Sequence, residues 1–509
     1  MHELPGDLAA TSEPRQVRGA AWSTVAPTPV AAPRLLAWSA EVAASLDFTA
    51  GDLNSSELLA ALSGNGTLPG MQTYSTCYGG HQFGHWAGQL GDGRAIGLGE
   101  LINQRGERWE LQLKGAGRTP YSRMADGRAV LRSSVREFLC SEAMHHLGIP
   151  TTRALSLVAT GEAVLRDMFY DGNARTEPGA IVCRVSPTFT RFGHFEIFAS
   201  RGEHALLAQL VEFTIDRDFP EIRSSGDARL SEWLTAVGAR TARLIVEWMR
   251  VGFVHGVMNT DNMSIAGLTI DYGPYGWLEN FDPGWTPNTT DATGRRYCYG
   301  RQAAIARWNL ERLVQALAAL KWPAGVLSEA TDAFDAEYER RMPAMLAQKF
   351  GWAAWRPEDA ALVTEIFDLM QRAEVDMTEF FRALAGVDLS APDASLLSGA
   401  FYRDALRDAE QGSLAGWLQR YALRGLADQL PEAERAARMN AVNPRFVLRN
   451  YLAQLAIDAA EQGDITLLET TLDVMRHPYE EQPGRESYAA LRPDWARHKP
   501  GCSMLSCSS

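Results

Sequence analysis

Apolar and polar residues alternate along the first part of the chain in the pattern of strands. Residues 95–101 and 108–114 flank the turn sequence Asn103-Gln104-Arg105-Gly106, which predicts a β-hairpin. From 128 to 147 the apolar positions recur at helical spacing, and Gly148-Ile149-Pro150 ends that pattern. Further strand-like segments lie at 153–158, 163–166 and 180–185. The pattern predicts a β-rich lobe that contains one main helix.

The pattern becomes helical after about residue 205. Leu234, Val237 and Leu244 mark one apolar face of a helix predicted over 231–251. Helical segments separated by Pro and Gly follow at 301–320, 327–348, 356–385, 396–424, 446–462 and 464–475. Protein kinases also place a β-rich lobe before a helix-rich lobe. The predicted fold class is therefore α+β, protein-kinase-like and bilobal, with a helical C-terminal extension.

Four regions are expected from these patterns. Residues 1–70 are predicted to be an irregular N-terminal extension, because their beginning is rich in Ala, Pro, Thr and Gly. Residues 71–204 form the predicted N-lobe, and 205–500 form the helical C-lobe with the candidate catalytic and metal-binding loops. Residues 501–509 are expected to be a flexible tail that carries Cys502 and Cys507.

Charge and hydropathy exclude several classes of partner. The net charge of −13 argues against nucleic acid, because phosphate neutralisation needs clustered cations. No apolar run reaches the roughly 18 residues that suggest a membrane span. The N-terminal segment carries Glu3, Asp7 and Glu13 and does not resemble a secretory signal. We therefore expect a cytoplasmic protein without a membrane partner.

Lysine is rare in this chain, which makes Lys114 informative. Of 49 basic residues only four are lysines, and Lys114 ends a predicted strand. A strand lysine held by a helix glutamate fixes an ammonium against nucleotide phosphates in kinases. Glu137 and Glu142 are both available on the following helix, and Glu137 is favoured because it lies at mid-helix. The loop Ala125-Asp126-Gly127-Arg128 opens that helix, and its residues favour capping over nucleotide contact.

The stretch His255-Gly256-Val257-Met258-Asn259-Thr260-Asp261-Asn262 precedes Asp271-Tyr272-Gly273. In kinases, His-x-Asp-x-x-x-x-Asn and Asp-Phe-Gly supply the proton acceptor and the Mg²⁺ ligands. Here Asn262 and Asp271 keep the ligand positions, so they are candidates for binding Mg²⁺ or Mn²⁺. Val257 stands where the proton acceptor belongs, and Asp261 offers a carboxylate four residues later. The candidate base is therefore Asp261.

Glycine and arginine residues supply candidate phosphate contacts. Gly91, Gly93 and Arg94 form a turn before a strand, where backbone amides can approach phosphates. Arg184 lies in an otherwise apolar strand, and Arg191 follows shortly after it. A buried arginine needs an anionic partner, which is either a structural acid or a polyphosphate.

Five segments together resemble the selenoprotein O family of kinase-like protein adenylyltransferases. They are YGGHQFGHWAGQLGDGRA, LQLKGAGRTPYSR, ADGRAVLRSSVREFL, VCRVSPTFTRFGHFE and HGVMNTDNMSIAGLTIDYGPYG. The resemblance runs from about residue 70 to the end of the chain. It implies a pseudokinase fold that binds ATP in a flipped orientation, so that the α-phosphate faces the acceptor.

The resemblance also implies roles for residues at matching positions. It places the nucleotide against Gly91, Gly93, Arg94, Lys114, Asp126, Gly127, Arg184 and Arg191. It pairs Lys114 with Glu137, makes Asp261 the proton acceptor, and assigns the metal to Asn262 and Asp271. For Asp126 it replaces the capping interpretation with nucleotide contact. Cys507 stands where many relatives carry a selenocysteine.

The sequence thus predicts a metal-dependent protein nucleotidyltransferase. It would transfer AMP from ATP to Ser, Thr or Tyr hydroxyls of protein substrates, and UMP transfer from UTP stays open because no residue obviously reads the base. One alternative is a kinase that uses Asp261 for γ-phosphoryl transfer. The other is a catalytically inactive nucleotide-binding scaffold.

Overall fold

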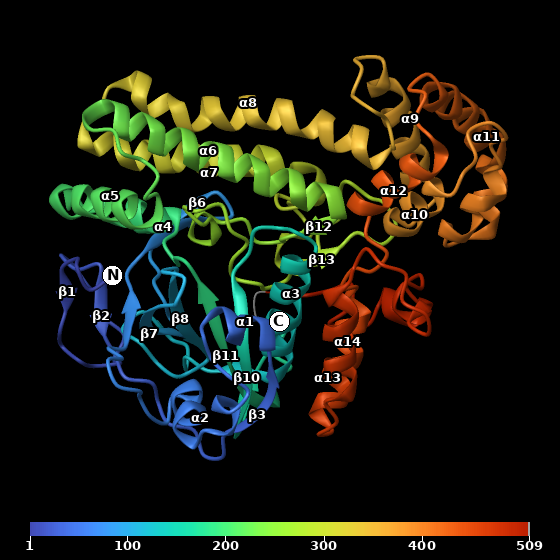
Figure 1. The fold of residues 1–509 in the computed structure, drawn as a ribbon. Coiled ribbons are helices and arrows are strands. Elements are labelled where there is room, and N and C mark those ends of the chain that lie inside the picture. Colours follow the sequence, from blue (N-terminus) through green and yellow to red (C-terminus); the bar gives the residue numbers. More distant parts are fainter. Residues whose placement is uncertain (507–509) are drawn as a thin grey trace.

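A nine-stranded sheet dominates the N-terminal part of the computed structural model, which describes residues 1–506 (Figure 1). Its strands are β1 (Gly6–Asp7), β2 (Trp22–Thr24), β3 (Arg34–Trp38), β4 (Tyr74–Thr76), β7 (Ala95–Ile102), β8 (Arg108–Lys114), β9 (Ala129–Val130), β10 (Arg153–Arg166) and β11 (Arg175–Ser186). They run in the order β1-β2-β4-β7-β8-β11-β10-β3, and β9 pairs with β11. Two small pairs lie apart from this sheet: β5 (Gly79–Gln82) with β6 (His85–Gln89), and β12 (Phe253–Val254) with β13 (Gly276–Trp277).

Helices make up most of the remaining described chain. They are α1 (Ala40–Ser45), α2 (Ser56–Ser63), α3 (Leu131–His146), α4 (Phe192–Ser200), α5 (His204–Asp218), α6 (Gly226–Val251), α7 (Gln302–Leu317), α8 (Ala324–Lys349), α9 (Asp359–Arg372), α10 (Met377–Ala385), α11 (Asp404–Leu426), α12 (Glu432–Val442), α13 (Asn450–Glu461) and α14 (Thr466–Arg476). Figure 1 shows α6, α7 and α8 as a layer of long helices, with α9 to α12 grouped beyond one end of α8. Within residues 1–506, none of these helices combines the length and apolarity that crossing a bilayer needs. The predicted α+β class is confirmed.

The two faces of the sheet pack against different helices. Leu58 and Leu62 of α2 pack in one cluster with Leu113 of β8. On the other face, Phe138 of α3 belongs to the cluster that contains Val182 of β11. The far side of α3 contacts α13 and α14. Because side chains alternate along a strand, positions 112 and 114 of β8 face α3 rather than α2.

Locally patterned elements lie close to where the sequence predicted them. The hairpin over 95–101 and 108–114 is β7 and β8, and the first predicted helix is α3. The predicted strands 153–158 and 163–166 are one strand, β10, with irregular register against β11 between Ala159 and Ala163. The segment predicted over 356–385 is two helices, because Glu374 adopts a φ of 51° between them and Asp376 caps α10.

Residues 1–70 differ from the irregular extension that their composition suggested. They contain β1, β2, β3, α1 and α2, and β2 and β3 pair with β4 and β10 of the sheet. Short strands of this kind gain their hydrogen bonds from distant partners, so their own sequence carries a weak signal.

The described part of the C-terminal tail is also packed. Cys502 is 3% exposed, and its carbonyl accepts a hydrogen bond of 2.7 Å from Asn450 Nδ2. Leu505 is fully buried and exchanges backbone hydrogen bonds with Pro287 and Thr289. Residues 501–506 therefore do not form the flexible tail that was expected, and Cys507 lies outside the described residues.

Candidate active site

A cavity of about 810 Å³ brings together nearly all of the candidate residues. Its walls come from the start of β7, the end of β8, β11, the loop after β8 and the two segments that match kinase loops. The candidates that line it are Gly91, Gly93, Arg94, Lys114, Asp126, Gly127, Arg184, Arg191, Asp261, Asn262 and Asp271. Glu137 is not part of the wall and contacts the cavity through Lys114.

Lys114 extends from β8 toward α3 and forms a buried ion pair with Glu137. Glu142, the other acid considered, is engaged elsewhere, because its two oxygens each accept a 2.7 Å hydrogen bond from Arg153. Burial lowers the pKa of Lys114, and the Glu137 charge opposes that shift. A lysine held by one carboxylate keeps further N–H groups for a ligand in the cavity.

Two arginines converge on Asp271, which adopts a left-handed φ of 54°. Arg184 Nη1 lies 2.5 Å from Asp271 Oδ1, and Arg191 Nη1 contacts Oδ2. Burial would raise the pKa of Asp271, but the Arg191 and Arg184 charges bring it well below its ordinary value. Arg184 also lies 3.3 Å from Glu137. Structural acids thus neutralise both arginines, at a position where phosphate oxygens could compete for the same N–H groups.

Asp261 lies in a single helical turn, Thr260–Asn262. The residues on either side of it are held by hydrogen bonds, from the His81 N–H to Thr260 Oγ1 and from Asn262 Nδ2 to the Val257 carbonyl. Gln82 Nε2 donates a 3.2 Å hydrogen bond to Asp261 Oδ2, while the buried Oδ1 accepts none from any residue of 1–506. Burial raises the pKa of Asp261 to about 7, against the Gln82 hydrogen bond and the Arg191 charge. A carboxylate with one oxygen that lacks a hydrogen-bond partner and with such a pKa can accept a proton at neutral pH. Val257 lines the same cavity and offers no such group.

Asn262 and Asp271 line the same cavity, and both carry the side-chain oxygens that a Mg²⁺ or Mn²⁺ site requires. A metal ion would share the Asp271 oxygens with Arg184 and Arg191. Asn262 Nδ2 donates to the Val257 carbonyl at 2.9 Å, which orients the amide. No described residue is seen donating to Asn262 Oδ1, so this oxygen is available as a ligand. The donor set fits a hard cation that takes its remaining ligands from phosphate and water. His255, the first residue of this motif, bonds through Nε2 to the Ile270 carbonyl at 2.9 Å and joins the two loops.

The three candidate glycines are required by close backbone packing. A Cβ atom on Gly91, whose φ is +88°, would lie 2.4 Å from the Tyr121 ring. A Cβ on Gly93 would lie 2.9 Å from the Tyr121 carbonyl, and one on Gly127 would lie 2.1 Å from the Gly117 carbonyl. Side chains at these positions would therefore displace the wall of the cavity. With glycine there, backbone atoms form the surface of this wall.

Asp126 does not cap α3, so that interpretation of the sequence is wrong. The helix begins at Leu131, and its N-cap residue is Val130. Asp126 instead accepts hydrogen bonds of 2.7 and 2.8 Å from Arg166 and one of 2.9 Å from the Arg128 backbone. It thereby joins the loop after β8 to the end of β10 at the rim of the cavity.

Sequence reasoning missed two glutamines of the site. Gln112 lies directly opposite Arg184 in the strand register, and its Oε1 accepts a hydrogen bond from Arg184 Nη2. Its position two residues before Lys114 on a strand was a usable signal, because such residues share a face. Gln82, which contacts Asp261, is 179 residues away in sequence and left no comparable signal.

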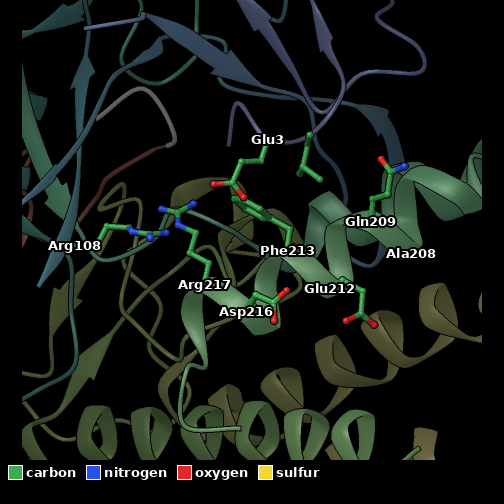
Figure 2. Close-up of a pocket in the computed structure, with 9 residues that line it drawn as sticks. Glu3, Arg108, Ala208, Gln209, Glu212, Phe213, Asp216 and Arg217 are labelled. Atoms are coloured by element: carbon green, nitrogen blue, oxygen red, sulfur yellow. The ribbon is translucent and has the colours of Figure 1, made fainter. Parts of the chain in front are cut away.

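A second hollow of about 510 Å³ lies between the N-terminal segment and α5. Figure 2 shows Glu3, Arg108 and Arg217 gathered at one end of it. Arg217 is already paired with Glu110 and lies 3.6 Å from Asp218. The hollow contains none of the candidate residues, and its buried arginine is neutralised by structural acids.

Known proteins resemble this chain over nearly all of its length. The family model described as Protein adenylyltransferase SelO matches residues 9–476. The chain belongs to this family. Proteins named Protein nucleotidyltransferase YdiU from Methylobacillus flagellatus, Tolumonas auensis and Aromatoleum aromaticum are 64%, 63% and 62% identical to it. Each match covers 100% of this chain and 98% of the relative. The resemblance predicted from the five segments is confirmed.

Proposed function

We propose that the chain transfers AMP from ATP to hydroxyl side chains of proteins and releases pyrophosphate. The observation that carries this proposal is the position of Asp261. Asp261 lines a cavity together with Lys114, Arg184 and Arg191, and its buried Oδ1 has no hydrogen-bond partner within residues 1–506. The family and the names of its relatives support the same class of reaction.

We also propose a kinase-like, two-lobed frame for this reaction, with the lobes meeting near residue 204. Support comes from the pair between Lys114 on β8 and Glu137 on α3, which corresponds to the kinase strand–helix pair. The segment from His255 to Asp271 further supports it, because its two loops are joined by a hydrogen bond.

The cations of the cavity are suited to a departing pyrophosphate. We place the outer phosphates of a flipped ATP near Arg184, Arg191 and Lys114, with the α-phosphate toward Asp261. Buried donors that are already oriented stabilise developing negative charge without reorganising. Arg184 and Arg191 are both 3% exposed or less and are held by Asp271, so they meet this requirement.

Asp261 acts as the proton acceptor in this proposal. A Ser, Thr or Tyr hydroxyl attacks the α-phosphorus, its proton passes to the Asp261 carboxylate, and the bond to the pyrophosphate oxygen breaks. Asn262 and Asp271 would hold Mg²⁺ or Mn²⁺, which neutralises phosphate charge when bound.

Labelled nucleotide distinguishes this reaction from its alternatives. The purified protein is incubated with Mg²⁺ or Mn²⁺ and ATP labelled at the α- or the γ-phosphate, and intact mass is measured in parallel. We expect α-label and an added AMP on protein, and we expect EDTA to remove both. Transfer of γ-label to protein instead would identify a kinase. UTP labelled at the α-phosphate tests UMP transfer in the same assay.

Variants of the site test the named roles. Lys114→Ala and Asp271→Ala are each expected to reduce AMP incorporation by about 100-fold or more, because each removes a group that acts on the phosphates. Lys499→Ala is the matched control, since Lys499 pairs with Asp458 outside the cavity. Val257→Asp places a carboxylate where kinases have their proton acceptor, and we expect that this variant still transfers no γ-phosphoryl group. If the unmodified chain bound nucleotide but transferred neither label, and Asp271→Ala changed nothing, the chain would be a nucleotide-binding scaffold.

A further inference from the structure

The β5–β6 hairpin connects the candidate base to the protein surface. Gln82, at the end of β5, donates to Asp261 Oδ2 at 3.2 Å. Two residues later, a Cβ atom on Gly84 would lie 3.5 Å from the Arg296 guanidinium carbon. The backbone between them is fixed, because the Phe83 N–H donates to Tyr297 Oη at 2.9 Å. Arg296 therefore lies beside the hairpin turn that directly follows Gln82, the residue that contacts the candidate base Asp261.

Aromatic rings hold Arg296 in place. Its guanidinium carbon lies 4.5 Å from the centre of the Trp308 ring of α7. Trp308 in turn packs edge-on against His81, which also contacts Trp86 of β6. Trp86 is 40% exposed, so this group of rings reaches solvent. We call the surface formed by Gly84, Trp86, Arg296 and Trp308 the hairpin face.

The hairpin face carries one arginine, Arg296, that has no direct carboxylate partner among the described residues. Arg296 forms no ion pair with any carboxylate within residues 1–506, although the chain has a net charge of −13. The nearby Asp291 is engaged by the backbone N–H groups of Arg296 and Tyr297, at 2.9 and 2.7 Å. By contrast, Arg307 of α7 pairs with Glu311 and Asp335.

We propose that the hairpin face docks the acceptor protein and selects an acidic side chain close to the acceptor hydroxyl. The proposal rests on the proposed function and adds the chemistry of its substrate. A guanidinium that is stacked on an aromatic ring keeps its edge N–H groups for a carboxylate, which it binds in a bidentate manner. Tryptophan and arginine are also the residues that most often dominate binding at protein interfaces.

Gly84 limits how much of Arg296 the hairpin covers. A Cβ atom at this position would lie 3.5 Å from the guanidinium carbon, so any other residue would cover more of the guanidinium. An acceptor segment lying across Gly84 would meet Arg296 at one end and the cavity containing Asp261 at the other. Acidic segments fit this surface by charge, whereas basic segments are repelled.

Peptide binding tests the docking surface without requiring catalysis. Two fluorescent peptides share one tyrosine and differ only in flanking glutamates or glutamines, and anisotropy measures their affinity for the full chain. We expect the glutamate peptide to bind about fivefold more tightly, as for a partly exposed ion pair. Arg296→Gln is expected to abolish the preference, and Arg296→Glu to reverse it. Arg105→Glu is the control, because Arg105 is 60% exposed and pairs with Glu107 in a distant turn.

Enzymatic assay then separates this proposal from the proposed function. With α-labelled ATP, the same fivefold preference is expected in the KM of the peptides. Transfer of AMP to neither peptide would contradict the proposed function, and the anisotropy result would still decide the docking. Equal binding of both peptides by the unmodified chain would overturn the docking proposal. So would a glutamate preference that both Arg296 variants retain.

Discussion

Buried charged side chains occur both inside and outside the candidate site, and their surroundings decide which protonation state is stable. In the cavity, each buried arginine has a carboxylate partner, and the pKa of Asp271 is held low by that arrangement. Asp218, at the end of α5, shows the opposite balance. Its side chain is 3% exposed, and burial raises its pKa to about 7 although Arg217 is near. One buried carboxyl group is thus stabilised in its ionised form and another in its neutral form.

Asp218 is expected to make stability depend on pH. Its pKa in the folded chain, about 7, exceeds the value of about 3.9 for an unfolded chain. The folded state therefore binds more protons between these values, and the free energy of unfolding falls as pH rises from about 4 to 7. Asp218→Asn removes this loss. We expect the variant to gain roughly 1–2 kcal/mol over the unmodified chain between pH 5 and pH 8 in urea unfolding. If the two proteins differed in free energy of unfolding by the same amount at pH 5 and at pH 8, Asp218 would not be the source of the pH dependence.

At the residue scale, the sequence predicted those contacts that have a local or chemical signal. Lys114 was identifiable because lysine is scarce here, and Glu137 because of its mid-helix position. The contacts of Asp271 with Arg184 and Arg191 could not be told from phosphate binding, since either anion satisfies a buried arginine. Gln82 could not be found at all, because its contact with Asp261 depends on how the hairpin folds over the turn.

At the scale of elements, Asp376 connects α10 to α13. One of its oxygens accepts the Glu379 N–H at 3.0 Å and so caps α10. The other accepts a 2.7 Å hydrogen bond from Arg449, which immediately precedes α13. Both partners of this ion pair are at most 1% exposed. One carboxylate therefore fixes the start of two helices.

Removal of that carboxylate is expected to be costly. Asp376→Ala leaves the Arg449 charge buried without its partner and removes the cap, so we expect a loss of about 3–5 kcal/mol in the free energy of unfolding. Asp404→Ala, at the first turn of α11, is the control. Its side chain is 83% exposed, and we expect a change within about 0.5 kcal/mol. Chemical denaturation of both variants measures the difference, and similar small losses would argue against the role of Asp376.

Elements with their own periodicity were predictable, and elements stabilised by distant pairing were not. The α3 helix and the β7–β8 hairpin follow local patterns of apolar residues and turn residues. The strands of residues 1–70 are short and depend on β4 and β10 for their hydrogen bonds. The break between α9 and α10 depends on the left-handed backbone of Glu374, which its residue type does not predict.

At the scale of the whole molecule, the end of the described chain reaches back to the catalytic segment. Leu505 exchanges backbone hydrogen bonds with Pro287 and Thr289, at 3.0 and 2.8 Å. Between them, Asn288 Nδ2 donates to the Gly256 carbonyl at 3.0 Å. The segment 287–289 is thus held between the C-terminal residues and the loop that leads to Asp261.

We expect Leu505→Asp to lower the rate of AMP transfer. A charge at this fully buried position would release the 287–289 segment, and small displacements of positioned groups reduce rates steeply. A roughly tenfold decrease in kcat is expected, with nucleotide affinity changed by less than about twofold. Met504→Asp serves as the control, because Met504 is 37% exposed. Equal activity of both variants would show that the contact does not support catalysis.

The scarcity of lysine has a practical consequence for chemical probing. Lys349 is buried, with its Nζ donating to the Arg250 carbonyl and Asn443 Oδ1, and Lys321 and Lys499 lie outside the cavity. An acylating nucleotide analogue therefore finds one ε-amine in the cavity, that of Lys114. Peptide mapping of acylated lysines would report ligand occupancy at Lys114, and the solvent-accessible Lys321 and Lys499 would measure acylation that does not depend on the cavity.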